Sequence, residues 1–228
     1  FLPQWGCINE RRNQLHEVIR LSGMNIIIDG NDHPLIIKVA SLQPARMQVY
    51  FIDNDDYFDK RGMETDDYGY EYADNGERAI FYARGVLETV KKLRWRPDVI
   101  HCQGWISAVV PLYIKTAFKD EPSFNGTKVV FEVNNVKLKD NLPGNFSSCL
   151  ATRNVTKAFL KKENMKFESP DDLLKLGVKF SDALILGTND ASKEVVDFAE
   201  SNGKPVLPFM ENPDYPSYYG EFYEKLLS

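Results

Sequence analysis

The sequence has few cysteines, no long apolar run and no cluster of basic residues, and each absence excludes a class of protein. Its 228 residues include three cysteines, Cys7, Cys102 and Cys149. Three widely spaced cysteines fit neither a disulfide framework nor a zinc site, so we expect a reducing, cytoplasmic location and no metal. No apolar run approaches the ~20 residues of a membrane-spanning helix, and no signal peptide opens the sequence. We therefore expect no membrane partner.

The charge of the chain is slightly negative and evenly spread. The formal net charge is -5, and lysine and arginine are scattered. Proteins that bind nucleic acid concentrate positive charge on one face, so nucleic acid is not an expected partner. With 43% hydrophobic and 27% charged residues, the chain has the composition of a globular domain with a sizeable core.

The segment 94–113 gives the clearest pattern of strand, turn and helix. Pro97 ends a preceding helix because it has no N–H to donate. Residues 98–102 are a short apolar run, typical of a strand covered on both faces, and Gly104 permits a sharp turn. In an open parallel sheet, ligands bind beyond the carboxyl ends of the strands. The pattern therefore predicts three side chains at a candidate binding rim: His101, Gln103 and Trp105.

The rest of the chain alternates between strands and helices. Strands are expected at 25–29, 34–42 and 47–53, with the last two joined as a hairpin. Segments 54–76 and 134–170 are polar or irregular. Further helices and strands are expected in alternation at 77–94, 98–102, 108–113, 128–133, 172–180, 183–186, 191–201, 205–208 and 215–227. This order predicts an α/β fold: a single Rossmann-like domain with a mainly parallel sheet and helices on both faces.

The residues assign no catalytic group. We find no Ser-His-Asp pattern and no glycine-rich phosphate loop. No two carboxylates are placed with certainty in one cleft, as a general acid–base pair requires. We therefore name no catalytic residue and expect no cofactor.

Several motifs, in a fixed order, carry a family resemblance. They lie at 9–18, 49–53, 58–62, 74–84, 92–101, 111–113 and 180–183. On these motifs the chain resembles the N-terminal domain of bacterial glycogen and starch synthases, most closely the short single-domain synthase-like proteins of Bacteroides-type bacteria. The resemblance implies one half of a GT-B glycosyltransferase. Its members are retaining enzymes that transfer glucose from ADP-glucose to an α-1,4-glucan.

The chain also departs from the family at the rim. The family motif reads His-x-His-Asp-Trp-His, and the matching residues 101–106 keep only the first histidine and the tryptophan. Ile106 stands where the resemblance implies a histidine at the donor sugar. An isoleucine cannot hydrogen-bond a sugar, and losing one electrostatic group often costs ~10²–10³ in rate.

The resemblance also carries an expectation about domain organisation. Residues 1–228 should form one N-terminal-type domain that lacks the family's first strand–helix unit and its ADP-gripping C-terminal domain. A parallel sheet without that strand should have an open edge or a gap. We expect ~40 further N-terminal residues, the length of a strand–helix unit, or a neighbouring chain to fill it.

Six residues are candidates for substrate binding, and most of them also have a structural explanation. His101 either contacts a ligand or is a core histidine, and Trp105 either stacks on a glucose ring or packs in the core. Asp74, Asn75 and Arg78 either bind sugar hydroxyls or phosphate, or cap a helix and form a surface ion pair. Asn135 is the sixth candidate. Four tyrosines either line a glucan groove or pack as a lid: Tyr57, Tyr68, Tyr70 and Tyr72.

Two classes of function therefore remain open. In the first, the chain is a glycogen-synthase-type transferase of α-glucan metabolism, acting alone or with a partner that supplies the donor domain. In the second, it is a non-enzymatic relative that binds α-glucan or docks onto a working synthase. The chemistry of the rim favours the second. The expected partners are an α-glucan or nucleotide sugar, a second copy of the chain, or a partner synthase.

Overall fold

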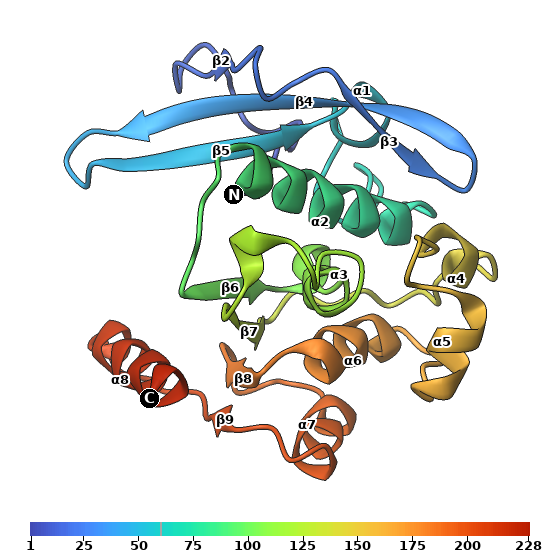
Figure 1. The fold of residues 1–228 in the computed structure, drawn as a ribbon, viewed down its shortest axis with the longest axis vertical. Coiled ribbons are helices and arrows are strands. Elements are labelled where there is room, and N and C mark those ends of the chain that lie inside the picture. The colour runs from blue at the N-terminus through green and yellow to red at the C-terminus, as the bar shows by residue number, and fades with distance from the viewer. Residues whose placement is uncertain (60) are drawn as a thin grey trace.

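The chain folds into two β-sheets joined by one long helix (Figure 1). The computed structural model describes residues 1–59 and 61–228, so Lys60 of the 58–62 motif lies outside it. The first sheet has the order β1-β5-β4-β2, with β3 also paired to β4. Its strands are β1 (Leu2–Pro3), β2 (His16–Glu17), β3 (Met24–Ile28), β4 (Asn31–Leu42) and β5 (Met47–Asp53).

The second sheet is parallel throughout. Its order is β6-β7-β8-β9, and all three strand pairs are parallel. The strands are β6 (Val99–Gln103), β7 (Lys128–Val133), β8 (Ala183–Leu186) and β9 (Val206–Leu207). In β7 every residue after Lys128 is buried, as expected for a strand covered on both faces. The predicted α/β fold with a parallel sheet is confirmed, and the hairpin strands form a separate, mainly antiparallel sheet.

The meander of the first sheet is specified locally. Strands β3 and β4 are joined by a two-residue turn, with φ of 48° at Asp29 and 83° at Gly30. Positive φ at both turn residues suits the right-handed twist of the flanking strands, and Asp-Gly is a favoured pair there. Along β4 the buried side chains alternate, with Leu35, Ile37 and Val39 facing the core. The expected strands and hairpin are therefore confirmed.

Helices cover both faces of the parallel sheet, as the alternation predicts (Figure 1). On one face lie α2 (Asn75–Lys92), the 3-10 turn η1 (Trp105–Ser107), α3 (Val110–Lys115), α6 (Asp171–Phe180) and α7 (Lys193–Ser201). On the other face, α8 (Tyr215–Leu227) packs Tyr219, Phe222 and Tyr223 over Val130, Ala183 and Ile185.

Short helices interrupt the segments expected to be irregular. They are α1 (Asp55–Phe58), η2 (Pro122–Phe124), α4 (Phe146–Cys149) and α5 (Lys157–Lys162). Asn54 caps α1, because its side-chain oxygen accepts from the backbone N–H groups of Asp56 and Tyr57. No helix in the described ranges is both long and apolar enough to cross a membrane.

The two sheets meet at a gap beneath α2. Within 1–59 and 61–228, β1 pairs with β5 alone and β6 pairs with β7 alone. Neither strand reaches the other, and α2 packs against β3 and β5 of the first sheet and against η1 and α3, which cover the second sheet. Within the described residues β1 and β6 therefore each have one partner strand, and the expectation of a preceding strand–helix unit stays a prediction.

The packing of α6 on β7 yields a stability prediction. A methyl group added at Gly177 would lie 2.8 Å from Cζ of Phe131, a fully buried ring. We expect Gly177→Ala to lower the free energy of unfolding by about 1–3 kcal/mol, because the core is overpacked. Gly220 in α8 is the matched control, since a methyl group there meets nothing within 4 Å. Gly220→Ala should leave stability unchanged or raise it by up to about 1 kcal/mol. Urea denaturation measures both, and equal stability of Gly177→Ala and wild type would contradict the packing.

Candidate functional site

The candidate site begins where β6 turns into η1. Gly104 has φ of 68°, a conformation that residues with a side chain rarely adopt. A Cβ at this position would lie 2.6 Å from Nδ2 of Asn134. Glycine therefore permits both the turn and the close approach of the β6 and β7 ends, which places two strand termini at one rim.

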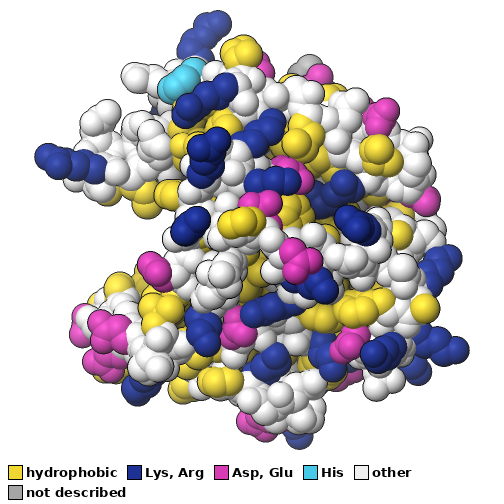
Figure 2. Space-filling model, in the orientation of Figure 1, with side chains coloured by type: hydrophobic (Ala, Val, Ile, Leu, Met, Phe, Trp, Pro, Cys, Tyr) yellow, Lys and Arg dark blue, Asp and Glu magenta, His cyan; other side chains and the backbone are white. Residues whose placement is uncertain are grey.

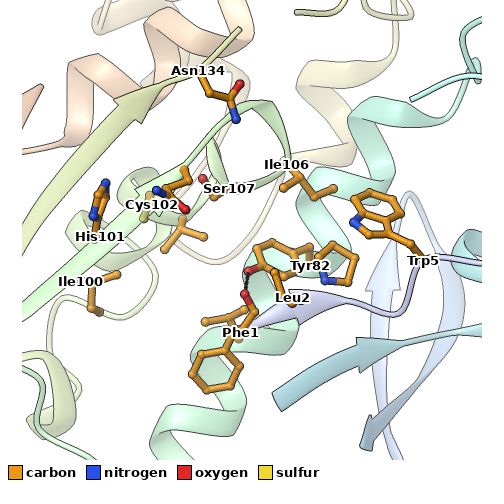
Figure 3. Close-up of a pocket in the computed structure, with 14 residues that line it drawn as sticks. Phe1, Leu2, Trp5, Tyr82, Ile100, His101, Cys102, Ile106, Ser107 and Asn134 are labelled. Carbon is orange, nitrogen blue, oxygen red and sulfur yellow. Dashed lines mark hydrogen bonds between the residues drawn. The ribbon is translucent and has the colours of Figure 1, made fainter. Parts of the chain in front are cut away.

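A cavity of about 280 Å³ opens beside this rim, between β6 and β1 (Figure 3). The rim contributes the polar side chains of His101, Gln103, Ser107 and Asn134. Aromatic side chains from the opposite wall also line the cavity, namely Phe1, Trp5 and Tyr82. None of the described residues that line it is a lysine or an arginine. The cavity thus combines aromatic faces and polar groups, without a lysine or arginine side chain among the described lining residues.

His101 lies at the rim as predicted, but protein groups occupy both nitrogens of its ring. Its Nδ1 shares a hydrogen bond of 2.7 Å with the hydroxyl of Tyr223. Its Nε2 lies 2.9 Å from Oε2 of Glu132, which also accepts a hydrogen bond of 3.2 Å from Gln103. His101 therefore joins β6 to β7 and α8, and of its neighbours Gln103 is the one exposed to solvent.

The cluster around His101 keeps Glu132 ionised. Burial alone would raise the pKa of Glu132, but the contacts from His101 and Gln103 outweigh it and hold the pKa below its ordinary value. Burial and the adjacent Glu132 raise the pKa of Tyr223 to about 12, so this hydroxyl stays protonated. An ionised Glu132 and a protonated Tyr223 both favour the contacts that His101 makes with β7 and α8.

Sequence reasoning missed Glu132 and the tyrosines of α8. A signal for Glu132 was present, because it is the one charged residue in the apolar run 129–133. A charge in a strand covered on both faces needs a partner. The tyrosines gave no such signal, since their partners lie about a hundred residues away: His101 and Tyr223 are 122 positions apart.

Trp105 is buried and packs in the core. It is 4% exposed, and its ring centroid lies 6.3 Å from that of Trp5. Trp5, which sequence reasoning did not single out, lines the cavity and also meets Phe58 edge-on at 5.5 Å. The tryptophan that lines the cavity is therefore Trp5.

Asp74, Asn75 and Arg78 come together at the start of α2, apart from the cavity lining. Arg78 is fully buried and donates to three oxygens, those of Met63 (2.5 Å), Gly62 (2.8 Å) and the Asn75 side chain (2.8 Å). Its Cζ lies 4.9 Å from the ring of Trp5. This guanidinium therefore fastens the 61–74 loop to α2 and to the aromatic wall.

Burial also changes the ionisation of this group. It lowers the pKa of Arg78 to about 10, with repulsion from Arg61 adding to the effect. Asp74 does not cap α2 with its side chain and instead forms two hydrogen bonds of 2.7 Å with Arg61. Asp74, Asn75 and Arg78 thus hold the 61–74 loop against the start of α2, an arrangement that we call the Arg78 clamp.

The remaining candidates are divided between core and surface. Asn135 is exposed just after β7, next to the cavity residue Asn134. Tyr57 is buried and donates to Glu77, and Tyr72 stacks under Arg61 at 4.0 Å. Tyr68 and Tyr70 are exposed, at 87% and 74%. Of the four tyrosines, only this last pair presents free ring faces.

The described residues offer neither a metal site nor a reactive thiol at the rim. No group of three or more potential ligands for a metal ion occurs among them. Cys102 is buried in β6, and burial raises the pKa of its thiol to about 12. A thiol that stays protonated is a poor nucleophile, so Cys102 is a packing residue.

Comparison with known structures matches this fold to a sugar transferase. The catalytic domain of starch synthase IV from Arabidopsis thaliana, bound to ADP and acarbose, superposes with a TM-score of 0.69 at 18% identity. The superposition covers 95% of this chain and 45% of that one. The chain therefore has the fold of part of a starch synthase catalytic domain.

Sequence comparison gives the family. The model of the starch synthase catalytic domain matches residues 1–205. The glycogen synthase of Pelodictyon phaeoclathratiforme is 32% identical over 196 residues, which are 86% of this chain and 39% of that protein. The glycogen synthase of Chlorobium luteolum is 38% identical over 143 residues, 62% of this chain and 29% of that protein. The chain belongs to the starch synthase catalytic domain family, and it spans well under half the length of these relatives.

The Glu132 cluster predicts a pH-dependent stability. Because folding lowers the pKa of Glu132, its contribution is complete above the ordinary value of 4.5 and is lost as the pH falls through the folded pKa. We expect Glu132→Gln to reduce the free energy of unfolding by about 1–3 kcal/mol at pH 7. The difference from wild type should shrink between pH 5 and pH 3. Urea denaturation across this range measures it, with exposed Glu221→Gln as control. A difference that stays constant with pH would contradict the assignment.

The Arg78 clamp predicts a loop that loosens when the guanidinium is lost. Lysine keeps the charge but lacks the rigid fork that reaches three oxygens. We expect Arg78→Lys to lower the free energy of unfolding by about 2–4 kcal/mol. Chymotrypsin should also cut faster at the exposed Tyr68 and Tyr70. Exposed Arg20→Lys is the control, and unchanged cleavage in Arg78→Lys would refute the clamp.

Proposed function

We propose that this chain is a synthase-like domain of α-glucan metabolism that binds an α-glucan at the rim cavity and does not transfer glucose by itself. The observation that carries the proposal is the lining of the cavity, in which no described residue is a lysine or an arginine. Transfer of glucose from ADP-glucose releases ADP. A catalyst must stabilise the negative charge on the diphosphate of this leaving group with cations or N–H groups. The rim offers aromatic faces and neutral amides instead.

The side chains around the cavity support the same proposal. Ile106 lines the cavity at the position where the family resemblance implies a histidine, and its side chain has no polar atom. His101 shares a hydrogen bond with Tyr223 through Nδ1, and its Nε2 is buried 2.9 Å from Oε2 of Glu132, so groups of the protein itself lie against both ring nitrogens. Gln103 donates to Glu132, and Asn134 accepts from Val136 N. Because a carboxamide has two N–H donors and a carbonyl acceptor, each of these side chains keeps further groups for the recognition of hydroxyls.

The family supports the choice of ligand. A structural neighbour is a starch synthase bound to ADP and acarbose. Acarbose is a sugar, and the cavity combines Trp5 with Gln103 and Asn134. Ligand pockets typically have such apolar walls and a few placed polar groups. We propose an α-glucan end as the occupant, with residues 1–228 acting as one N-terminal-type domain of GT-B architecture. The cytoplasmic location stays a prediction.

A second candidate function is a transferase completed by another polypeptide. The observation in its favour is the family, because the model of the starch synthase catalytic domain matches residues 1–205. In this case a partner synthase would supply the cations that the cavity lacks. The two candidates differ in what happens when such a partner is added.

An assay of glucose transfer tests the proposal. The purified 228-residue chain is incubated with radiolabelled ADP-glucose and maltoheptaose, alone and with a full-length glycogen synthase rendered inactive by mutation in its own N-terminal domain. We expect no incorporation above the no-protein control in either mixture. Incorporation by the chain alone would refute the proposal, and incorporation only in the mixture would establish the second candidate.

A binding experiment tests the glucan site. We expect maltoheptaose to produce a saturable change in tryptophan fluorescence, because Trp5 lines the cavity. Gln103→Ala should weaken binding by about tenfold, as expected for the loss of one or two hydrogen bonds. Trp95→Phe is the control, since Trp95 lies outside this cavity. No saturable change in the wild type would remove the glucan site.

A further inference from the structure

We propose that a cavity at the carboxyl ends of β7 and β8 binds an organic cation, an ammonium group carried either by a small molecule or by a lysine side chain of another polypeptide. This α8 cavity has a volume of about 260 Å³ and is lined by residues of the strand ends, of α8 and of the segment between β9 and α8. Gln103 is the one described residue that lines both it and the rim cavity. The proposal therefore concerns a separate site and does not depend on the proposed function.

Glu132 supplies a negative charge to the wall of the α8 cavity, although the residue is only 7% exposed. Burial raises the pKa of Glu132, but the contacts from His101, Gln103 and Tyr219 outweigh it, so the carboxylate is ionised at neutral pH. No lysine or arginine forms an ion pair with Glu132 in the ranges that the structure describes. A buried charge without a full cationic partner is costly, so a cation that enters the cavity stabilises it.

Gly187 gives this carboxylate room at the end of β8. A Cβ at position 187 would collide with Oε1 of Glu132, so a larger residue would push the carboxylate aside. The other oxygen, Oε2, faces His101 at 2.9 Å and Gln103 at 3.2 Å. Because Gly187 itself lines the cavity, the oxygen beside it is the one that the proposal assigns to the ammonium group.

Aromatic side chains form much of the remaining wall. Tyr215 and Tyr219 lie one turn apart on α8, with ring centroids 5.5 Å apart and ring planes at 70° to each other. Phe209, from the segment between β9 and α8, also lines the cavity and is 38% exposed. The face of an aromatic ring carries partial negative charge and attracts ammonium groups. Two steeply inclined rings beside a carboxylate are therefore suited to a cation.

The charges around the α8 cavity favour a cation over a sugar or a phosphate. Residues 208–228 include four acidic side chains and one lysine, and acidic side chains gather over α8 on the surface (Figure 2). None of the described residues that line the cavity is a lysine or an arginine. Such a surface concentrates cations and repels phosphate. The hydroxyl groups of a sugar would leave the charge of Glu132 uncompensated, so an ammonium group fits best.

The NMR signals of the methionine methyl groups test the proposal, because Met210 lines the cavity. The 228-residue chain, labelled with ¹³C at these methyl groups, is titrated with choline and with 3,3-dimethylbutan-1-ol, which has the same shape without the charge. We expect choline to shift the Met210 signal saturably, while the signals of Met24 and Met63 stay in place. The uncharged alcohol should bind at least about tenfold more weakly. Equal affinity for the two compounds, or no saturable shift with choline, would overturn the proposal.

Two variants locate the bound cation. Glu132→Gln removes the charge and should weaken choline binding by at least about tenfold, and Tyr215→Leu removes one ring and should weaken it by about threefold. Tyr218→Leu is the matched control, since Tyr218 lies on the same helix but does not line the cavity. Tyr215 is 50% exposed, so its replacement keeps the test decisive even if Glu132→Gln does not fold. Wild-type affinity in Tyr215→Leu would contradict the site.

Further titrations distinguish the source of the ammonium group. A capped Gly-Lys-Gly peptide, with its norleucine counterpart as control, is compared with choline. Tighter binding of the lysine peptide indicates a partner polypeptide, and tighter binding of choline indicates a small molecule; either result supports the site. Maltoheptaose bound in the rim cavity should leave choline binding unchanged. If maltoheptaose instead displaces choline, the α8 cavity binds sugar and the proposal is wrong.

Discussion

Helix α2 connects the first sheet to η1 and α3, which cover the second sheet, because within residues 1–59 and 61–228 no strand of one sheet pairs with a strand of the other. Ala79, Ile80 and Ala83 are fully buried, so the helix has core on more than one side. Gly85 allows the close approach to the first sheet, since a methyl group there would lie 2.8 Å from Cγ2 of Ile52. At the start of the same helix, Arg78 anchors the 61–74 loop. The cavity and the loop clamp both depend on the position of α2.

The polar side chains at the rim are held by contacts with other parts of the protein. His101 and Glu132 are bound to each other and to α8, and this contact covers the sheet face with tyrosines. Beside these groups the cavity is lined by amides and aromatic rings, without a lysine or arginine side chain among the described lining residues. The contacts that stabilise the domain therefore leave few side chains at the cavity that could bind a phosphate group. It is compatible with the recognition of a neutral sugar.

Local patterns in the sequence predicted most helices and strands, but they could not predict contacts between residues that lie far apart in the chain. The strand, turn and helix of 94–113 depend on Pro97, Gly104 and the apolar run between them, so they are visible in a short window. The division into two sheets depends on which strands pair, and residues such as His101 and Tyr223 meet across 122 positions. The sequence suggested Arg78 as a candidate ligand group, whereas the structure buries it. That burial depends on contacts with Trp5 and with the 61–74 loop, which no local pattern reveals.

The central claim is that this domain recognises the glucan and lacks the groups that would hold the diphosphate of a nucleotide sugar. Calorimetric titration of the 228-residue chain with ADP, beside a titration with maltoheptaose, tests it most directly. The account predicts a saturable heat with maltoheptaose and only heats of dilution with ADP. Saturable binding of ADP, with or without the glucan, would contradict it.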